Sequence, residues 1–413
     1  MTPLTMPRLY RQIRLAGYDS SLLQIKTRRT TNQETEKIMS RSHLKNWAVT
    51  AALTASILGA TLGAFGQQAR TVLEKRSTGV EVVAKLNLEP DNLAVTPNGL
   101  LVFGVRTTSD KQARVAQVSL DGTVSPFPNS KWAGPPREDG TGMTSVVAIK
   151  ATPDGLVWMF DRGSEQAPAK IVAWDTINNK LAKSFVFPVQ ARKRPPKFMH
   201  DIAVDGRNKL IYMAGTQTED SKTEGQPVLV VIDIRKQEIR LLPLNRPNFS
   251  VAATFDEART RQASSSKKVF EVGLNVPIGI DPDNQWVYFG YLASKTLWRV
   301  KADDLANINL SPDEVAAKVE KYGDKPIGNG IAPTESGVVY LSDELSNAIG
   351  AFDKVRNYRM IAKDEILNVP NGLCVAPDGY VYVCVNRPMR DTTYVKDQNE
   401  MRFIIARVKQ LQR

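Results

Sequence analysis

The sequence is poor in the residues from which many enzymes build their sites. It has two cysteines and two histidines among 413 residues. Two cysteines cannot make a disulfide framework, and two histidines exclude a histidine-rich metal centre. The HExxH, GxSxG, P-loop and CxxC motifs are also absent, so no signature of a zinc protease, a serine hydrolase or a P-loop nucleotidase is present. Any chemistry must come from residues that are scattered along the chain.

The chain has a positive excess, but the excess is not concentrated in its body. Lysine and arginine number 55 against 43 acidic residues, for a net charge of +12. Residues 1–69 hold nine of these basic residues and three acidic ones, which is half of the excess. The other half of the positive charge is spread over residues 70–413, so it is weak evidence that the body binds a polyanion. We therefore expect no nucleic-acid partner.

One long apolar run stands near the start of the chain. Residues 47–66 read WAVTAALTASILGATLGAFG, with Arg41 and Lys45 just before them and a small-x-small ending. This order is typical of an export signal. The run also nearly reaches the length of a membrane-spanning helix, so an uncleaved anchor is the alternative. We therefore interpret residues 39–69 as a signal peptide or an N-terminal anchor.

Met39 offers a start that would give this signal an ordinary length. Residues 1–38 are then an over-called start, which we expect to be disordered. No second long apolar segment follows, so we expect no membrane contact beyond the leader. The predicted location is secreted or periplasmic.

The body repeats one unit six times. An apolar run enters a turn of proline, aspartate, asparagine or glycine, and a second run rich in valine, tyrosine and tryptophan leaves it. Such turns suit tight hairpins, and the flanking residues suit strands. The copies are NLAVTPNGLLVFGVR (92–106), SVVAIKATPDGLVWMFDR (145–162), HDIAVDGRNKLIYMAG (200–215), PIGIDPDNQWVYFGYL (277–292), NGIAPTESGVVYLSD (329–343) and PNGLCVAPDGYVYVCVNR (370–387).

Most copies are followed by a third apolar strand, which gives units of three or four antiparallel strands. Six such units predict an all-β fold, a six-bladed β-propeller over residues 80–413. The strand VEVVAKLNL (80–88) precedes the first unit, and we expect it to close the ring beside the last blade. A β-sandwich with fortuitous turn spacing is the alternative.

Two further features belong to the body. KADDLANINLSPDEVAAKVEKYG (301–323) has a helical pattern, with Ser311 as N-cap and Glu314 three residues later. Cys374 and Cys384 stand on the two strands of the last hairpin, and either a cross-strand disulfide or two free thiols fits this placement.

Propeller geometry gathers the candidate site residues at one mouth of the central funnel. The inner strands converge on the axis, and each second strand ends beside the start of the first. The candidates at strand starts are Asn92, Thr144, His200, Asp201, Asn329 and Asn371. Those at the ends of second strands and in the loops that follow are Arg106, Asp161, Arg162, Tyr291, Asp343, Glu344, Asn386 and Arg387.

These candidates have alternative roles. His200 and Asp201 are the catalytic candidates, since histidine can act as a general base, but a bond to a neighbouring blade also explains such a histidine. The asparagines are ligand-binding candidates, although asparagine also favours turns. The arginines fit a carboxylate ligand or an ion pair between blades.

The order and spacing of these hairpins resemble the yellow / major royal jelly protein family in its bacterial form. The strongest stretches are LVFGVR (101–106), PFPNSKW (126–132), GLVWMFDRG (155–163), HDIAVDGRNKLIYMAG (200–215), PIGIDPDNQWVYFGYLASKTLWRV (277–300) and KPIGNGIAPTESGVVYLSDELSNAI (325–349). The resemblance implies a secreted six-bladed propeller with a ligand site in its funnel. Members of the family bind small amines or act in pigment pathways. One departure is Asn329, which stands where the family pattern suggests an acidic residue.

A weaker resemblance, to the gluconolactonase / senescence-marker propellers, implies a divalent cation such as Ca²⁺ in the funnel. Its ligands in this chain would be Glu89, Asn371 and Asp343. Carboxylate and amide oxygens are what such a cation prefers.

Two functions follow from these patterns. The first is a secreted, monomeric propeller that binds a small molecule through Asn92, Arg106, Asp161, Tyr291, Asn329, Asn371 and Asn386. The alternative is a metal-dependent lactonase or hydrolase that uses the same funnel. The sequence does not decide whether the protein is an enzyme.

Overall fold

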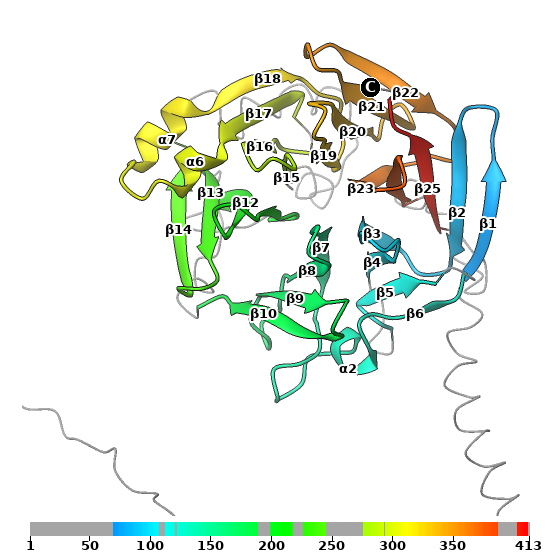
Figure 1. Ribbon diagram of the computed structural model, residues 1–413, viewed down its shortest axis with the longest axis horizontal. Coiled ribbons are helices and arrows are strands. Elements are labelled where there is room, and N and C mark those ends of the chain that lie inside the picture. Colours follow the sequence, from blue (N-terminus) through cyan, green and yellow to red (C-terminus); the bar gives the residue numbers. More distant parts are fainter. Residues whose placement is uncertain are drawn as a thin grey trace, which may run out of the picture. The chain divides into compact units, whose positions relative to one another are not determined.

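A computed structural model describes residues 69–106, 112–119, 122–188, 199–217, 226–244, 276–292, 294–386 and 403–411. These residues form six antiparallel sheets that surround a central axis, as the sequence predicts (Figure 1). The predicted over-called start, all of the predicted leader before Ala69 and the candidate Arg387 lie outside the described residues. None of the helices that the structure describes is long and apolar enough to cross a bilayer.

The first three sheets each contain four strands, and each runs in chain order from the axis outward. Sheet I contains β3 (Pro90–Val95), β4 (Leu101–Val105), β5 (Val115–Val118) and β6 (Val124–Pro126). Sheet II contains β7 (Val146–Ala151), β8 (Leu156–Asp161), β9 (Lys170–Asp175) and β10 (Lys180–Val186). Sheet III contains β11 (Ala203–Asp205), β12 (Leu210–Gln217), β13 (Gln226–Asp233) and β14 (Glu238–Pro243).

Two of the remaining sheets repeat this order, and the last is assembled from both ends of the propeller. Sheet IV contains β15 (Ile278–Ile280), β16 (Trp286–Phe289), β17 (Thr296–Lys301) and β18 (Glu320–Asp324). Sheet V contains β19 (Ile331–Pro333), β20 (Val339–Asp343), β21 (Ala348–Phe352) and β22 (Tyr358–Lys363). Sheet VI contains β23 (Pro370–Val375), β24 (Tyr380–Val385), β25 (Phe403–Lys409), β2 (Val80–Leu86) and β1 (Ala69–Lys75).

The ring closes in sheet VI. Strand β2 pairs with β25 from Val80 opposite Val408 to Leu86 opposite Phe403. This pairing confirms that the strand over residues 80–88 lies beside the last blade. Strand β1, which was not predicted from the sequence, extends the sheet on its outer side.

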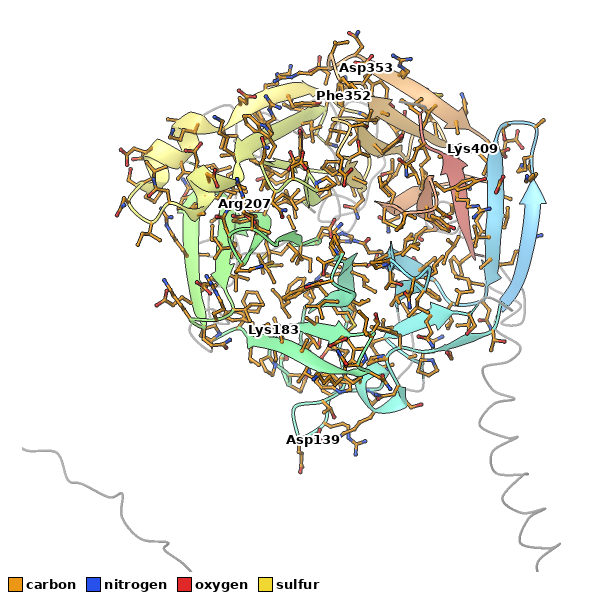
Figure 2. All side chains as sticks on the ribbon, in the orientation of Figure 1. Asp139, Lys183, Arg207, Phe352, Asp353 and Lys409 are labelled. Atoms are coloured by element: carbon orange, nitrogen blue, oxygen red, sulfur yellow. The ribbon has the colours of Figure 1, made fainter. Side chains whose placement is uncertain are left out.

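The composition of the strands matches their position in the sheet. The innermost strand β3 is buried at every residue, because neighbouring blades cover both of its faces. The outermost strand β10 reads KLAKSFV and is mostly exposed. Figure 2 shows side chains between the sheets, with the labelled Asp139 and Asp353 at the perimeter of the ring.

The turns of the six repeated hairpins are predicted at Gly99, Gly155, Gly206, Asn284, Gly337 and Gly379, and all of these except Gly206 have a left-handed backbone. Gly155 (φ 80°) and Asn284 (φ 55°) are two of them. In the third hairpin the left-handed residue is Lys209 (φ 59°), not Gly206. Asp205 accepts hydrogen bonds from the backbone N–H groups of Arg207 and Asn208, and this moves the left-handed position to the end of the turn.

An apolar cluster lies between each pair of neighbouring sheets. The described residues form six such clusters, which join I to II, II to III, III to IV, IV to V, V to VI and VI to I. The cluster between III and IV, for example, brings Tyr212 and Leu229 against Val287 and Val300. Burial of these faces is the main favourable contribution to the stability of the ring.

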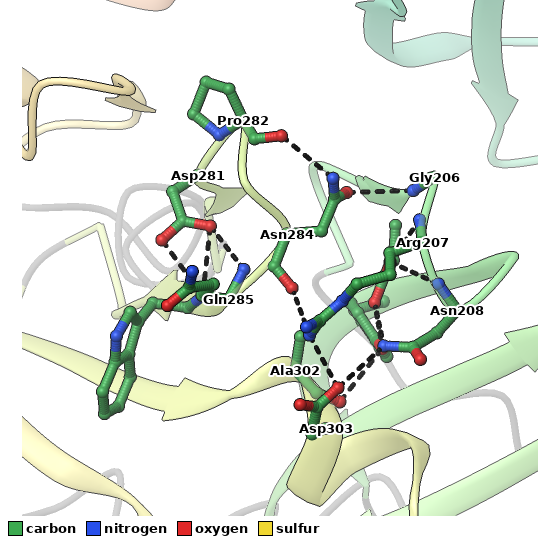
Figure 3. A network of polar contacts seen from close by, with 12 residues as sticks. Gly206, Arg207, Asn208, Asp281, Pro282, Asn284, Gln285, Ala302 and Asp303 are labelled. Atoms are coloured by element: carbon green, nitrogen blue, oxygen red, sulfur yellow. Dashed lines mark hydrogen bonds and ion pairs between the residues drawn. The ribbon is translucent and has the colours of Figure 1, made fainter.

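Polar contacts also connect neighbouring sheets at the hairpin turns. Arg207 donates to the backbone oxygen of Asn284 (2.7 Å) and to Asp303 Oδ1 (2.6 Å), and Asn284 Oδ1 accepts from Gly206 N (2.9 Å) (Figure 3). These bonds join sheet III to sheet IV at the end of the ring opposite the starts of the inner strands.

Three short helices accompany the described sheets. They are α2 (Ser130–Ala133), α6 (Ala302–Ala306) and α7 (Pro312–Lys318). Helix α7 begins with the expected capping box, in which Ser311 Oγ accepts from Glu314 N and the Glu314 side chain accepts from Ser311 N. Val315 and Ala316 pack it into the cluster between sheets III and IV, and the helix confirms the helical pattern predicted for this segment.

The two cysteines are free. The register of β23 and β24 places Tyr382, not Cys384, opposite Cys374. Burial raises the pKa of the Cys374 thiol to about 12. Of the two alternatives left open by the sequence, the structure shows the free thiols.

Candidate functional site

Six polar side chains are buried where the inner strands begin. Asp91 and Asn92 lie in β3, Asn371 lies in β23, His200 and Asp201 precede β11, and Asn329 precedes β19. Each is at most 5% exposed. Polar groups are costly to bury without partners, so their contacts decide what this cluster can do.

One part of the cluster is centred on the Asp91 carboxylate. Its Oδ1 accepts from Arg106 Nη2 (2.9 Å) and Asn371 Nδ2 (3.0 Å), and it lies 3.7 Å from His200 Nε2. Burial would raise the pKa of Asp91, but the neighbouring Arg106 and His200 hold it well below its usual value. Asp91 is therefore a buried carboxylate that stays ionised.

The asparagines continue this network across the axis. Asn329 Nδ2 donates to Asn371 Oδ1 (2.8 Å) and lies 3.1 and 3.2 Å from the two ring nitrogens of His200. A ring nitrogen that accepts this bond carries no proton. Sheets I, III, V and VI thus meet through Asp91, His200, Asn329 and Asn371.

A second part of the cluster is centred on Asp201. Its Oδ2 accepts from Lys150 Nζ (2.8 Å), and its Oδ1 accepts from Asn92 Nδ2 (3.3 Å) and Ile202 N (2.9 Å). Burial raises the pKa of Asp201, and the Lys150 charge opposes that rise. This part joins sheets I, II and III.

Two members of the cluster, Asp91 and Lys150, were not among the residues predicted from the sequence. Asp91 lies between Glu89 and Asn92, which were both selected, and it holds the central position in place of Glu89. Lys150 lies near the far end of β7 and was not at a strand start. Its signal was a lysine in the otherwise apolar run VVAIKA, since an inner strand tolerates a charge only when the charge is paired.

Four residues occupy the same place after the second strand of their sheets. The backbone N–H of Arg106 bonds to Glu89 O, that of Arg162 to Ser145 O, that of Glu344 to Ile327 O and that of Asn386 to Val369 O, at 2.9 to 3.1 Å. Each bond ties the end of a second strand to the start of the first. These residues therefore surround the same mouth of the axis.

Asp161 has a structural task at this mouth. Its carboxylate accepts from the backbone N–H groups of Thr144 (2.9 Å), Ser145 (2.8 Å) and Gly163 (3.1 Å). The structure thus engages Asp161 with the backbone, and its contact with a ligand stays a prediction.

Tyr291 also lies apart from the cluster. Its hydroxyl is 3.5 Å from Thr216 Oγ1, and its ring lines a small apolar cavity of about 20 Å³ between sheets III and IV. The expected contact of Tyr291 with a ligand stays a prediction.

The predicted cation ligands do not form a metal site. Asp343 accepts from Ser346 N (3.0 Å), whereas Asn371 belongs to the Asp91 network. Arg106 lies between Glu89 (3.4 Å) and Asp91 (2.9 Å), so a guanidinium already supplies the positive charge there. Within the described ranges, no group of three histidine, cysteine or acidic residues is suited to a metal ion. The donor set therefore does not fit a divalent cation.

Comparison with protein families agrees with this architecture. The model of the major royal jelly protein family matches residues 144–413. The chain belongs to the major royal jelly protein family. The match begins at Thr144 and covers sheets II to V, together with the strands of sheet VI that follow them in the chain. A search of curated proteins found no match.

Solved structures with a similar fold include other propellers of low sequence identity. A gluconolactonase from Xanthomonas campestris has a TM-score of 0.48 and 10% identity, over 83% of this chain and 94% of its own. A catalytically inactive virginiamycin B lyase from Staphylococcus aureus, solved with quinupristin, has a TM-score of 0.43 and 10% identity, over 80% and 99%. A calcium-binding regucalcin from Agrobacterium tumefaciens has a TM-score of 0.42 and 11% identity, over 78% and 90%.

Proposed function

We propose that this member of the major royal jelly protein family binds a small polar molecule at the mouth of its axis where the inner strands begin. The observation that carries the proposal is the buried polar cluster, to which five of the six sheets contribute. A polar rim at a propeller axis is a common form of small-molecule site.

Two amide oxygens support a ligand at this place. Asn329 Oδ1 and Asn386 Oδ1 are buried and have no hydrogen-bond partner among the described residues. Leaving such an acceptor unsatisfied costs about 1–3 kcal/mol. A ligand that donates to these oxygens recovers that cost on binding.

The alternative of a metal-dependent lactonase is not proposed, because Arg106 already pairs with Glu89, one of the two carboxylates that were predicted to hold the cation, and with the neighbouring Asp91. A catalytic role of His200 and Asp201 stays a prediction. We further propose that the protein is exported and monomeric, as the leader and the closed ring favour.

The test is a binding screen with Asn371→Ala and the control Asn178→Ala. Asn371 connects Asp91 to Asn329, whereas Asn178 lies in an exposed turn. Small amines, amino acids, sugars and organic acids are screened by thermal shift, and binding is then measured by calorimetry. We expect Asn371→Ala to weaken binding about tenfold or more, and Asn178→Ala to leave it unchanged.

Circular dichroism establishes that both variants are folded. The proposed site would be wrong if the screen finds no ligand. It would also be wrong if the ligands bind folded Asn371→Ala as tightly as they bind the wild type.

A further inference from the structure

Arg162 is an arginine at the mouth of the axis whose side chain has no partner in the described part of the chain. No hydrogen bond or ion pair of its guanidinium occurs there, although the equivalent Arg106 pairs with both Asp91 and Glu89. Arg162 is an exposed residue, so a ligand can reach it from solvent.

Hydrogen bonds to the backbone around Arg162 fix the position of this residue at the mouth. Asp161 accepts three backbone N–H groups around it, and the Arg162 N–H bonds to Ser145 O (2.9 Å). Desolvation by the surrounding protein lowers the pKa of Arg162, Asp91 raises it and Arg106 lowers it. The three charged groups thus lie within electrostatic range of one another, with Arg162 near the buried cluster.

Two carboxylates of the mouth, Asp91 and Glu89, are already engaged. Asp91 accepts from Arg106 and Asn371 and faces His200, and Glu89 pairs with Arg106. Neither of these two acids forms an ion pair with Arg162. An anionic group of a ligand could therefore pair with its guanidinium.

The same mouth also offers unpaired acceptors. Asn386 occupies in sheet VI the position that Arg162 occupies in sheet II, and its Oδ1 lacks a partner in the described chain. Asn329 Oδ1, beside His200, lacks one as well. These oxygens require donors, so the ligand carries hydroxyl groups in addition to its charge.

We propose that the ligand is a small hydroxy acid, whose carboxylate pairs with Arg162 and whose hydroxyl groups donate to Asn329 and Asn386. The proposal rests on the proposed function and names the chemical class that the same site accepts. A planar carboxylate suits the fork of a guanidinium, which can bind both of its oxygens.

The experiment uses glycerate and tartrate as probes, with glyceramide and tartramide as their neutral counterparts. Calorimetry compares the wild type with Arg162→Gln, Arg162→Lys and the control Arg235→Gln, whose guanidinium pairs with Asp233 at an exposed turn. We expect at least one acid to bind and its amide to bind about tenfold more weakly, because a charge-assisted bond is lost.

Arg162→Gln is expected to lose the same factor for the acid, Arg162→Lys to retain part of the binding, and Arg235→Gln to behave as the wild type. Equal binding of acid and amide, an undiminished acid affinity in Arg162→Gln, or no binding of either acid overturns the inference. A neutral ligand that is lost in Asn371→Ala but unaffected in Arg162→Gln would leave the proposed function standing and refute this one.

Discussion

Lys325 is a buried amine beside the candidate site, four residues before Asn329. It is 3% exposed, and its Nζ donates to the backbone oxygens of Leu292 (3.3 Å) and Pro326 (3.0 Å). Gly290 makes room for it, because a Cβ there would lie 3.2 Å from Lys325 Cε. Burial lowers the pKa of Lys325 to about 7, although Glu344 and Asp343 oppose the shift. Because this pKa is close to 7, the amine is about half protonated in the folded protein at neutral pH.

Lys325→Met should change how stability depends on pH. Between about pH 7 and 10.5 the unfolded wild type binds a proton at Lys325 that the folded protein does not bind, so the free energy of unfolding rises with pH. The slope is up to about 1.4 kcal/mol per pH unit. The methionine variant lacks this slope, so its stability relative to the wild type should fall from pH 7 to pH 9 in urea denaturation.

Lys321→Met is the matched control, since Lys321 is exposed and pairs with Asp324. It should follow the wild-type pH dependence. A constant difference between Lys325→Met and the wild type across this range would contradict the lowered pKa.

At the scale of elements, position in the sheet explains what the sequence could predict. Inner and second strands are covered on both faces, and their apolar runs with turn residues between them predicted the hairpins. Outer strands contact a neighbour on one edge only, so β1 needs no strong pattern and its sequence ARTVLEK did not reveal it. The turn after β11 was misplaced because Asp205 holds it by side-chain bonds that a dipeptide pattern does not contain.

Removal of β2 should destabilise the ring more than removal of everything before β1. A chain that begins at Leu88 lacks both β1 and β2, which leaves the β25 edge unpaired and uncovers Val383 and Ala406 in the cluster between sheets V and VI. We expect it to aggregate or to melt at a lower temperature, because open sheet edges associate. A chain that begins at Ala69 is the control and should remain monomeric in size-exclusion chromatography with light scattering. Equal melting temperatures and sizes of the two chains would refute this role of β2.

For the whole molecule, six repeats were enough to predict the ring, its closure and the mouth where polar residues meet. Strand order brings His200, Asn329 and Asn371 together, and hairpin geometry alone led to them. The same geometry could not tell that Asp343 bonds to its own turn or that Tyr291 faces an apolar cavity. It also could not anticipate Lys150, whose long side chain reaches Asp201 from another blade. Such contacts depend on side-chain conformations and on the position of each blade relative to its neighbours. A pattern of strands and turns in the sequence does not contain this information.

The whole chain also leads to a prediction about its mature start. The basic, apolar and small-residue order of residues 41–66 predicts cleavage that leaves a first residue between Gln67 and Arg70. Strand β1 begins at Ala69, where Ala69 pairs with Leu86 and Arg70 with Lys85, so cleavage in this interval preserves nearly all of the β1–β2 pairing. Cleavage further along would remove strand residues and weaken the outer edge of sheet VI. N-terminal sequencing of the native protein from the medium or periplasm should therefore give a start in this interval. An intact leader in the membrane fraction would instead identify it as an anchor.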